Sequence, residues 1–291
     1  MFTGRWVMGK SGDNKAVSTA LFDLYERYNR REYVSPDPLQ FLYDYGDVRD
    51  REVVGLVASS LAYGRVAQIL KSVSKVLARM GPSPAGFLRD SQPKALRREF
   101  GEAHSADFKH RFTTGEDLSA MLIGAKRAVE NHGSLEACFA AGLREGDDTV
   151  LPALAHFVGE LGLGNHKSNY LLPSPEKGSA CKRLNLFLRW MARKDEVDPG
   201  GWDGVSPSRL IVPLDTHMHR CCLSMGLTER KQADLKTAVE ITGVFKKISP
   251  EDPVKFDFSL TRLGIRDELD FRGFLEKCGL HSVRVGSSDP T

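Results

Sequence analysis

Apolar residues recur at helical spacing through most of this 291-residue chain, and this periodicity limits the folds open to it. Residues 16–30 place one apolar stripe along a helix, and residues 66–80 do the same before Gly81-Pro82 ends them. Residues 50–63 are mostly apolar and include small side chains, which indicates a central helix that others approach closely. No segment shows the alternating pattern of a strand. The pattern therefore predicts an all-α fold of about twelve helices.

Shorter periodic stretches predict the remaining helices. We expect them at residues 106–112, 116–131, 134–143, 148–162, 178–193, 215–226, 231–247 and 253–264. Two connections between helices are long, because residues 163–177 contain prolines and residues 194–214 are rich in Gly and Pro. A connection as long as 194–214 is uncommon in a compact domain and often has a function.

Composition indicates a soluble globular protein with reduced thiols. Hydrophobic residues make up 41% and charged residues 27%, both in the usual range, and no apolar run is long enough for a membrane helix. The N-terminus lacks the apolar core of a secretory signal, so we expect a cytoplasmic protein. The five cysteines include no C-x-x-C pair, which argues against zinc ribbons and iron–sulfur clusters. The net charge of +3 neither requires nor excludes nucleic acid.

The segment 211–222, IVPLDTHMHRCC, gathers an aspartate, two histidines and two cysteines. Only Asp215, His217 and Cys221 can converge on a metal ion, because His217 and His219 point about 200° apart on a helix. A mononuclear site needs three or four ligands, and none of the familiar local spacings is present. The alternative is that Asp215 is a helix N-cap. A capping aspartate can still present its free oxygen to a cleft, so the capping and functional interpretations are compatible.

The run Val-Pro-Leu-Asp-Thr-His, followed by Arg220, resembles the aspartate helix of the helix-hairpin-helix DNA glycosylase superfamily, whose pattern is V-D-T-H-V-x-R. This superfamily includes endonuclease III and the adenine, 8-oxoguanine and alkylpurine glycosylases. Residues 51–79, 172–188 and 252–265 are similar to its first barrel helix, its hairpin with the reactive lysine and its closing helix. GSACKRLNLFLRWM and VPLDTH together also resemble an uncharacterised bacterial domain family attached to this superfamily.

The resemblance implies a two-lobed helical bundle of the glycosylase type. Residues 51–210 would form a helical barrel lobe that ends in the hairpin-like lysine segment. Residues 1–50 and 211–291 would form a second lobe from both termini. The resemblance further implies a monomer that acts on double-stranded DNA with a damaged base, with no cofactor, no metal and no membrane partner.

Cleavage of an N-glycosidic bond builds positive charge on the sugar, and a nearby carboxylate stabilises that charge. The resemblance implies Asp215 for this role. Bifunctional members add a lysine whose neutral amine attacks C1′ and forms a Schiff base, after which β-elimination nicks the strand. The implied nucleophile is Lys182, the fifth residue of GSACK, which matches the lysine of the family's G-V-G-R-K. Lys177 is the alternative when the count starts from Leu172-Pro173.

Further residues are expected to contact DNA by the same resemblance. Contacts to nucleic acid are expected from Lys177, Gly178, Ser179, Arg183, His217 and Arg220. The base pocket, or a wedge in the duplex, is expected from Tyr63, Trp190 and Trp202. Arg183 and Arg189 are expected to lower the pKa of the Lys182 amine.

The hairpin-like segment departs from the family pattern at Ala180 and Ser174-Pro175, where glycines would let backbone N–H groups approach a phosphate. The spacing of 33 positions between Lys182 and Asp215 is wider than in endonuclease III and resembles archaeal 8-oxoguanine glycosylases. Oxidised guanine is therefore the favoured lesion.

Two other functions stay open from the sequence. One is a non-catalytic nucleic-acid-binding protein on the same fold, which the altered hairpin favours. The other is a metal-dependent hydrolase that uses Asp215, His217 and Cys221.

Overall fold

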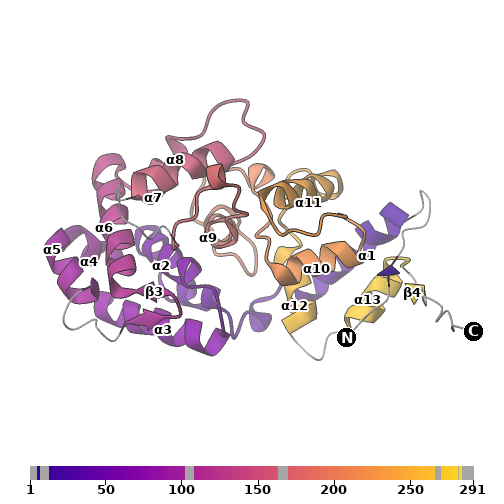
Figure 1. Cartoon of the computed structure of the whole chain (residues 1–291), viewed down its shortest axis with the longest axis horizontal. Helices are drawn as coiled ribbons and strands as arrows, with labels where there is room; N and C mark the ends of the chain where they lie inside the picture. The colour runs from indigo at the N-terminus through magenta and orange to yellow at the C-terminus, as the bar shows by residue number, and fades with distance from the viewer. Residues whose placement is uncertain are drawn as a thin grey trace, which may run out of the picture.

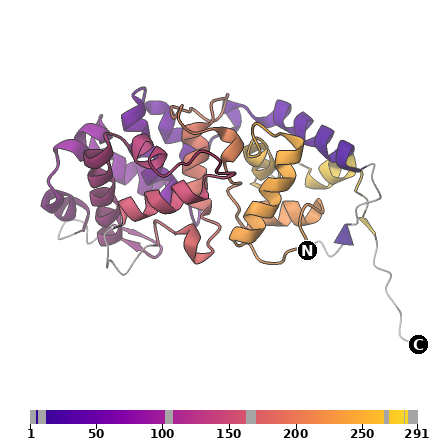
Figure 2. The same ribbon diagram turned by 90° about the horizontal axis from the view of Figure 1, so that it is seen from above.

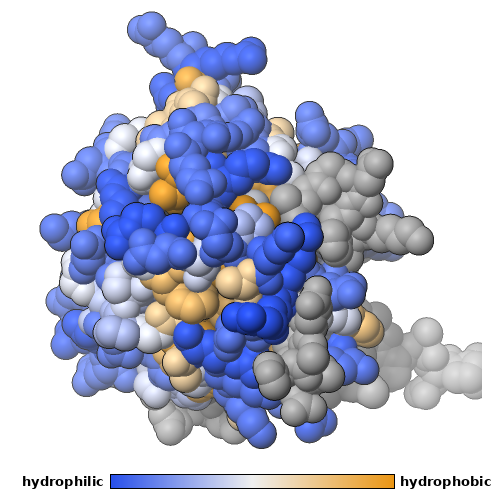
Figure 3. Space-filling model, turned by 90° about the vertical axis from the view of Figure 1, so that its left-hand side faces the viewer, coloured by the Kyte–Doolittle hydropathy of each residue, from blue (hydrophilic) through white to orange (hydrophobic). Residues whose placement is uncertain are grey.

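The computed structural model describes residues 5–6, 13–101, 108–162, 170–265, 270–280 and 282–283. It is mostly helical, with 64% helix and 2% strand, which confirms the all-α prediction (Figure 1). Within the described ranges, no helix combines the length and the apolar character needed to cross a bilayer. Figure 3 shows the end of the molecule near α4 and α5, where hydrophilic side chains cover most of the surface and hydrophobic ones lie between them.

The elements follow one another along the chain as a series of short and medium helices. The N-terminal half contains β1 (Arg5–Trp6), α1 (Asp13–Tyr28), η1 (Arg31–Tyr33), η2 (Pro38–Asp44), α2 (Val48–Ser60), α3 (Val66–Met80), α4 (Pro84–Asp90), α5 (Pro93–Leu96), η3 (Arg97–Gly101), β2 (Lys109–His110), β3 (Thr113–Thr114) and α6 (Gly115–His132). The C-terminal half contains α7 (Leu135–Ala140), α8 (Leu151–Leu161), η4 (Pro175–Lys177), α9 (Lys182–Ala192), η5 (Pro207–Arg209), α10 (Thr216–Ser224), α11 (Leu235–Ile248), α12 (Asp257–Ile265), α13 (Phe271–Lys277) and β4 (Ser282–Val283).

Regular periodicity located most of the longer helices. Helix α3 has the predicted bounds, and α6 differs from its prediction by one residue at each end. The prediction of a helix at residues 106–112 was wrong, because β2 and β3 form a two-stranded antiparallel hairpin there. Residues 106–107 lie outside the described residues. Periodicity did not predict α4 or α5, since each is too short for a pattern and begins at a proline in its first turn.

Helix α2 lies at the centre of the fold, as its apolar and small residues predicted. It packs against α9, η2 and α4. Gly55 faces the Phe187 ring of α9, and a Cβ at this position would lie 3.2 Å from that ring. The small residue therefore sets how closely the two helices approach.

Segments far apart in sequence pack together at the end of the molecule formed by α1, α10, α12 and α13. Helix α1 contacts α12 and α13, and α10 contacts α12 (Figures 1 and 2). A cluster of buried hydrophobic residues extends from Val17 to Leu280 and includes members from both ends. The division into lobes at residues 50 and 210 stays a prediction.

The long connection after α9 covers a buried network of ions. Arg189 pairs with Asp198 at 3.1 Å and with Asp257, while Arg193 pairs with Asp198 and with Asp252 at 2.9 Å. Both arginine side chains and Asp198 are almost completely buried. The connection expected to have a function thus has a structural one, because it supplies Asp198, a carboxylate that pairs with both buried guanidinium groups.

Candidate functional site

Asp215 caps the N-terminus of α10. Its Oδ1 atom accepts hydrogen bonds from the backbone N–H groups of His217 at 2.9 Å and Met218 at 2.8 Å. The side chain is half-buried, and its second oxygen, Oδ2, points to a different neighbour. The cap therefore fixes the orientation of the carboxylate and leaves one oxygen available.

The neighbour of Asp215 Oδ2 is Lys182. It is the first residue of α9, and its Nζ atom lies 3.8 Å from Asp215 Oδ2. The Nζ atom also donates a hydrogen bond to the carbonyl oxygen of Ala62 at 3.4 Å, just after α2. The side chains of Lys182 and Asp215 are 28% and 35% exposed, so both remain open to a ligand. The structure thus brings an amine and a carboxylate together from the starts of two helices.

The segment before Lys182 makes an irregular turn instead of a glycine hairpin. Gly178 ends η4 with a φ of 74°, and Cys181 adopts a φ of 47°, which is uncommon for a residue with a side chain. The Cys181 N–H group donates to Ser179 Oγ at 3.2 Å, and its thiol donates to the Pro173 carbonyl oxygen at 3.2 Å. These bonds hold the turn that aims α9 and its first side chain.

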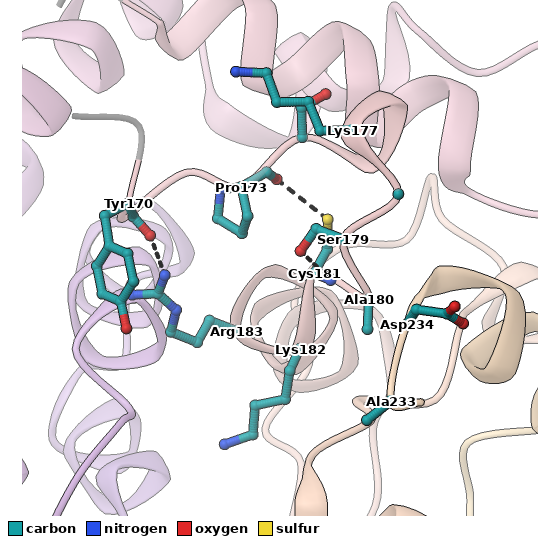
Figure 4. A pocket seen from close by; sticks show the side chains of 12 residues that line it. Tyr170, Pro173, Lys177, Ser179, Ala180, Cys181, Lys182, Arg183, Ala233 and Asp234 are labelled. Carbon is teal, nitrogen blue, oxygen red and sulfur yellow. Dashed lines mark hydrogen bonds between the residues drawn. The ribbon is translucent and has the colours of Figure 1, made fainter. Parts of the chain in front are cut away.

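This turn forms the wall of a pocket of about 620 Å³ (Figure 4). Its lining consists of Tyr170, Pro173, Ser174, Lys177, Gly178, Ser179, Ala180, Cys181, Lys182, Arg183, Ala233 and Asp234. Asp215 is not among the lining residues. The pocket therefore lies beside the lysine–aspartate pair and shares Lys182 with it.

The nucleophile alternative, Lys177, has a different setting. It is exposed in η4, and Figure 4 shows its side chain directed away from that of Lys182. No carboxylate of the described residues forms an ion pair with it. The geometry thus favours Lys182, and leaves Lys177, Gly178 and Ser179 as accessible groups on the pocket wall.

Arg183 is engaged with the protein itself. It donates hydrogen bonds to the carbonyl oxygens of Ser60, at 2.7 Å, and Tyr170. Its guanidinium group lies 5.0 Å from the ring centre of Tyr63 and 4.6 Å from that of Tyr170. Arg189, which was also expected to act on Lys182, is buried and paired with two carboxylates. Arg183 therefore joins α9 to the end of α2, which limits the phosphate contact expected for it.

Tyr63 is held in the protein rather than presented to a duplex. Its hydroxyl contacts the His110 carbonyl oxygen at 2.7 Å and Thr113 Oγ1 at 2.6 Å, and its ring packs edge-on against Tyr170. The exposed aromatic residues at this place are Phe112, 69% exposed at the tip of the β2–β3 hairpin, and Tyr170, 45% exposed. Phe112 is thus the most exposed of these aromatic residues, in a segment where helical periodicity had predicted a helix.

The two tryptophans expected in a base pocket lie in the core. Trp190 and Trp202 are each 1% exposed. Trp202 packs against the rings of Phe139 and Phe187, and its Nε1–H group donates to Glu52 Oε1 at 2.9 Å. A residue this deep cannot stack on a base without a rearrangement of the core, so the burial of both side chains argues against the base-pocket prediction.

His217 and Arg220 lie on the outer part of α10. Arg220 is exposed and lies 3.3 Å from His217 Nδ1 through its Nη2 atom, and His217 Nε2 lies 3.5 Å from Cys221 Sγ. The pKa of His217 lies below its usual value, because the effect of burial outweighs the opposing charge of Asp215. Arg220 is therefore the accessible cation of this helix.

The metal interpretation of this segment gains no support. Among the described residues, one group brings three metal-ligating side chains within 4.8 Å of one another, and Asp215, His217 and Cys221 are not its members. The cysteine is fully buried, and burial raises its pKa to about 12, so the thiolate that a metal requires is disfavoured.

Asp257, at the start of α12, is a residue of the site that sequence reasoning missed. Its Oδ2 atom pairs with Arg189, and its Oδ1 atom is buried with no hydrogen-bond partner among the described residues. Burial raises its pKa to about 6, against the effect of Arg189, and the charges of Asp215 and Lys182 also act on it. Asp257 therefore links the lysine–aspartate pair to the buried ion network.

We expect Asp257 to make stability fall as the pH rises from about 4 to about 7. Its pKa is raised by folding, so the native state binds the proton more tightly than the unfolded state, and this contribution is lost as the pH passes 6. The free energy of unfolding of the wild type, minus that of Asp257→Asn, should decrease over this range by on the order of 2–3 kcal/mol. Urea unfolding at several pH values measures it. A difference that stays constant with pH would contradict the assignment.

These features define an all-α protein with a lysine–aspartate pair beside a pocket. Residues 37–266 match the family model described as protein of unknown function (DUF2400), and this chain belongs to that family. The matched span includes Lys182, Asp215 and Asp257. No curated protein and no solved structure matches the chain.

Proposed function

We propose that this protein is a DNA repair glycosylase that excises a damaged base and nicks the strand with Lys182. The observation that carries the proposal is the 3.8 Å approach of Lys182 Nζ to the free oxygen of the capping carboxylate Asp215. An oriented carboxylate and a primary amine are the two groups that the lyase reaction requires. The resemblance of both segments to the glycosylase superfamily supports the same reaction.

The amine is the nucleophile of this reaction. The neutral amine of Lys182 attacks C1′, the bond from C1′ to the base breaks, and the base leaves with the proton that the amine loses. Opening of the sugar ring gives a protonated imine. Loss of a proton from C2′ then expels the 3′ phosphate by β-elimination, which nicks the strand.

The carboxylate acts on the charge that develops at the sugar. Asp215 cannot rotate freely, because two backbone N–H groups hold its Oδ1 atom. Its Oδ2 atom is therefore oriented before the substrate arrives, and such preorganised groups stabilise a charged transition state without reorganising. Lys182 and Asp215 lie at the N-termini of α9 and α10, and their side chains approach within ion-pair distance there.

Exposed groups around the pair suit a DNA partner. Lys177 and Gly178 lie on the pocket wall, and Arg220 lies on α10. The β2–β3 hairpin carries exposed Lys109 and Arg111 beside Phe112. Cations around an exposed aromatic ring are the groups that bind a phosphate backbone and stack on an unpaired base.

Borohydride trapping of the wild-type protein tests the proposal. Duplexes with an abasic site, 8-oxoguanine, uracil or an alkylated base are incubated with the protein and reduced. We expect a covalent adduct with the abasic duplex and with one damaged base, 8-oxoguanine first, and peptide mapping should place it on Lys182. If no duplex gives an adduct or releases its base, the glycosylase proposal fails. Binding to the same duplexes would then support the non-catalytic alternative.

Phe112 gives a separate prediction about the duplex. Phe112→Ala should weaken binding to an abasic duplex by about tenfold to a hundredfold, because stacking of one base on an aromatic ring contributes about 1–3 kcal/mol. Phe112→Trp should retain binding. Fluorescence anisotropy measures the affinity.

Val239→Ala is the matched control for this prediction, since Val239 is also an exposed apolar residue but lies on α11. Equal affinities for Phe112→Ala and Val239→Ala would exclude a stacking role. Because Phe112 is 69% exposed, the thermal midpoint should not change in either variant by more than a few degrees.

A further inference from the structure

A cluster of potential metal ligands lies away from the lysine–aspartate pair, between α6 and α8. His132 is the last residue of α6, and His156 and Glu160 lie one turn apart on α8. One ligand atom from each of the three side chains lies within 4.8 Å of the other two, and His132 Nε2 lies 3.4 Å from Glu160 Oε2. We propose that these three residues bind a Zn²⁺ ion that joins α6 to α8.

The ligand types and their spacing fit zinc. Two imidazoles and one carboxylate form a three-ligand zinc site, in which water takes the fourth position. With metal–ligand bonds of about 2.0 Å, two ligands of a tetrahedral ion lie about 3.3 Å apart. The pair formed by His132 and Glu160 already has this separation. Residues four apart on a helix share a face, so His156 and Glu160 lie on the same side of α8, and a ligand atom of each is within 4.8 Å of the others.

His156 has a nitrogen that the protein leaves unsatisfied. Its Nε2 atom is buried and has no hydrogen-bond partner within the described part of the chain. The His132 and His156 rings lie perpendicular, with their centres 6.2 Å apart. A buried ring nitrogen without a partner is unfavourable, and coordination to a metal would satisfy it. The His132–Glu160 contact alone does not explain why His156 joins the cluster.

The backbone holds the two helices at a fixed distance here. Gly124 of α6 lies so close to α8 that an added Cβ would be 1.9 Å from the Leu161 carbonyl oxygen. Arg127 of α6 donates hydrogen bonds to the carbonyl oxygens of Glu160 and, at 2.6 Å, Gly162. The ligands therefore come from two helices that already cross at a fixed distance, which lowers the free-energy cost of assembling a metal site.

The cluster also adjoins the wall of the pocket through α8. Helix α8 contacts η4, which carries Lys177. The three ligands are each half-buried, so the fourth position is open to water, as in zinc sites with three protein ligands. This inference does not depend on the glycosylase proposal.

Zinc binding to the full-length protein tests the inference. The protein is treated with a chelator, dialysed and titrated with Zn²⁺ against a chromophoric competitor. We expect one equivalent to bind, with a higher thermal midpoint for the zinc-bound protein. Titration with Co²⁺ should give the visible absorption of a tetrahedral site.

Variants identify the ligands. His156→Gln and Glu160→Gln should each lower the zinc affinity by more than about a hundredfold, since loss of an outer partner alone costs about 10–100-fold. His132→Gln provides a third test if one of these variants does not fold. His217→Gln is the matched control, because His217 belongs to the other segment with metal-ligating residues.

Three outcomes would overturn the inference. They are no stoichiometric zinc in the wild type, an unchanged affinity in both His156→Gln and Glu160→Gln, and an affinity lost in His217→Gln instead. Since borohydride trapping measures a different site, failure of one proposal leaves the other intact.

Discussion

Lys182→Gln is expected to abolish the borohydride-trapped adduct with an abasic duplex, a loss of at least about a thousandfold, as when a covalent nucleophile is removed from other enzymes. Glutamine lacks the amine that attacks C1′, so no imine forms. The side chain is partly exposed and its hydrogen bond to Ala62 is long, so the fold should tolerate the change. Quantitative gel analysis of the reduced adduct measures the effect, with circular dichroism to verify folding.

Three variants separate the chemistry from binding. Lys182→Arg keeps a positive charge beside Asp215 but cannot form the imine, so it should bind DNA and give no adduct. Lys177→Gln should retain trapping. Asp215→Asn keeps the helix cap and loses the charge, and base excision should fall by about a hundredfold to a thousandfold. Trapping that persists in Lys182→Gln and disappears in Lys177→Gln would move the nucleophile to Lys177.

Arg189→Met is expected to destabilise the protein by about 3–5 kcal/mol. The arginine is buried between Asp198 and Asp257, and its removal leaves the buried Asp257 carboxylate without its partner and Asp198 without one of its two arginines. An unpaired charge in the interior is unfavourable by far more than the pair itself contributes. Urea unfolding followed by circular dichroism gives the free energy of unfolding.

Arg89→Met is the matched control for this effect. Arg89 also pairs with an aspartate, Asp90, but both side chains are more than 70% exposed. Its replacement should leave the free energy of unfolding nearly unchanged, because solvent screens an exposed pair. Adding Asp257→Asn to Arg189→Met should recover part of the loss by removing one unpaired charge. Equal losses for Arg189→Met and Arg89→Met would show that the buried network is not structural.

Periodicity and capping chemistry predicted the parts of the fold that depend on neighbours in sequence. Helix α3 has an apolar stripe and a terminal glycine, and its bounds were correct. Asp215 lies at a helix start with its cap partners two and three positions ahead, so its local geometry followed from a short segment. The proximity of Lys182 required the family resemblance, because no local rule joins positions 33 apart.

Contacts between distant segments explain the errors. Asp257 stands among apolar residues of α12, and its partner Arg189 is 68 positions away, so nothing nearby marks it as buried and charged. The β2–β3 hairpin depends on Tyr63, which hydrogen-bonds to it from 47 and 50 positions upstream. Trp190 lies on α9 and Trp202 in the connection after it, and both are buried by segments distant in sequence, which a local pattern does not identify.

The two carboxylate oxygens of Asp215 make different interactions, and this affects what an aspartate or a lysine at these positions means in other members of the family. One oxygen closes the first turn of α10, so a relative without the proposed lyase activity would still need an aspartate, or an asparagine, at this position to cap the helix. Lys182 contributes less to the stability of the fold, since it makes one long hydrogen bond and one partly exposed ion pair. If the proposed lyase function holds, lysine at the position of Lys182 should therefore mark an active relative better than aspartate at the position of Asp215.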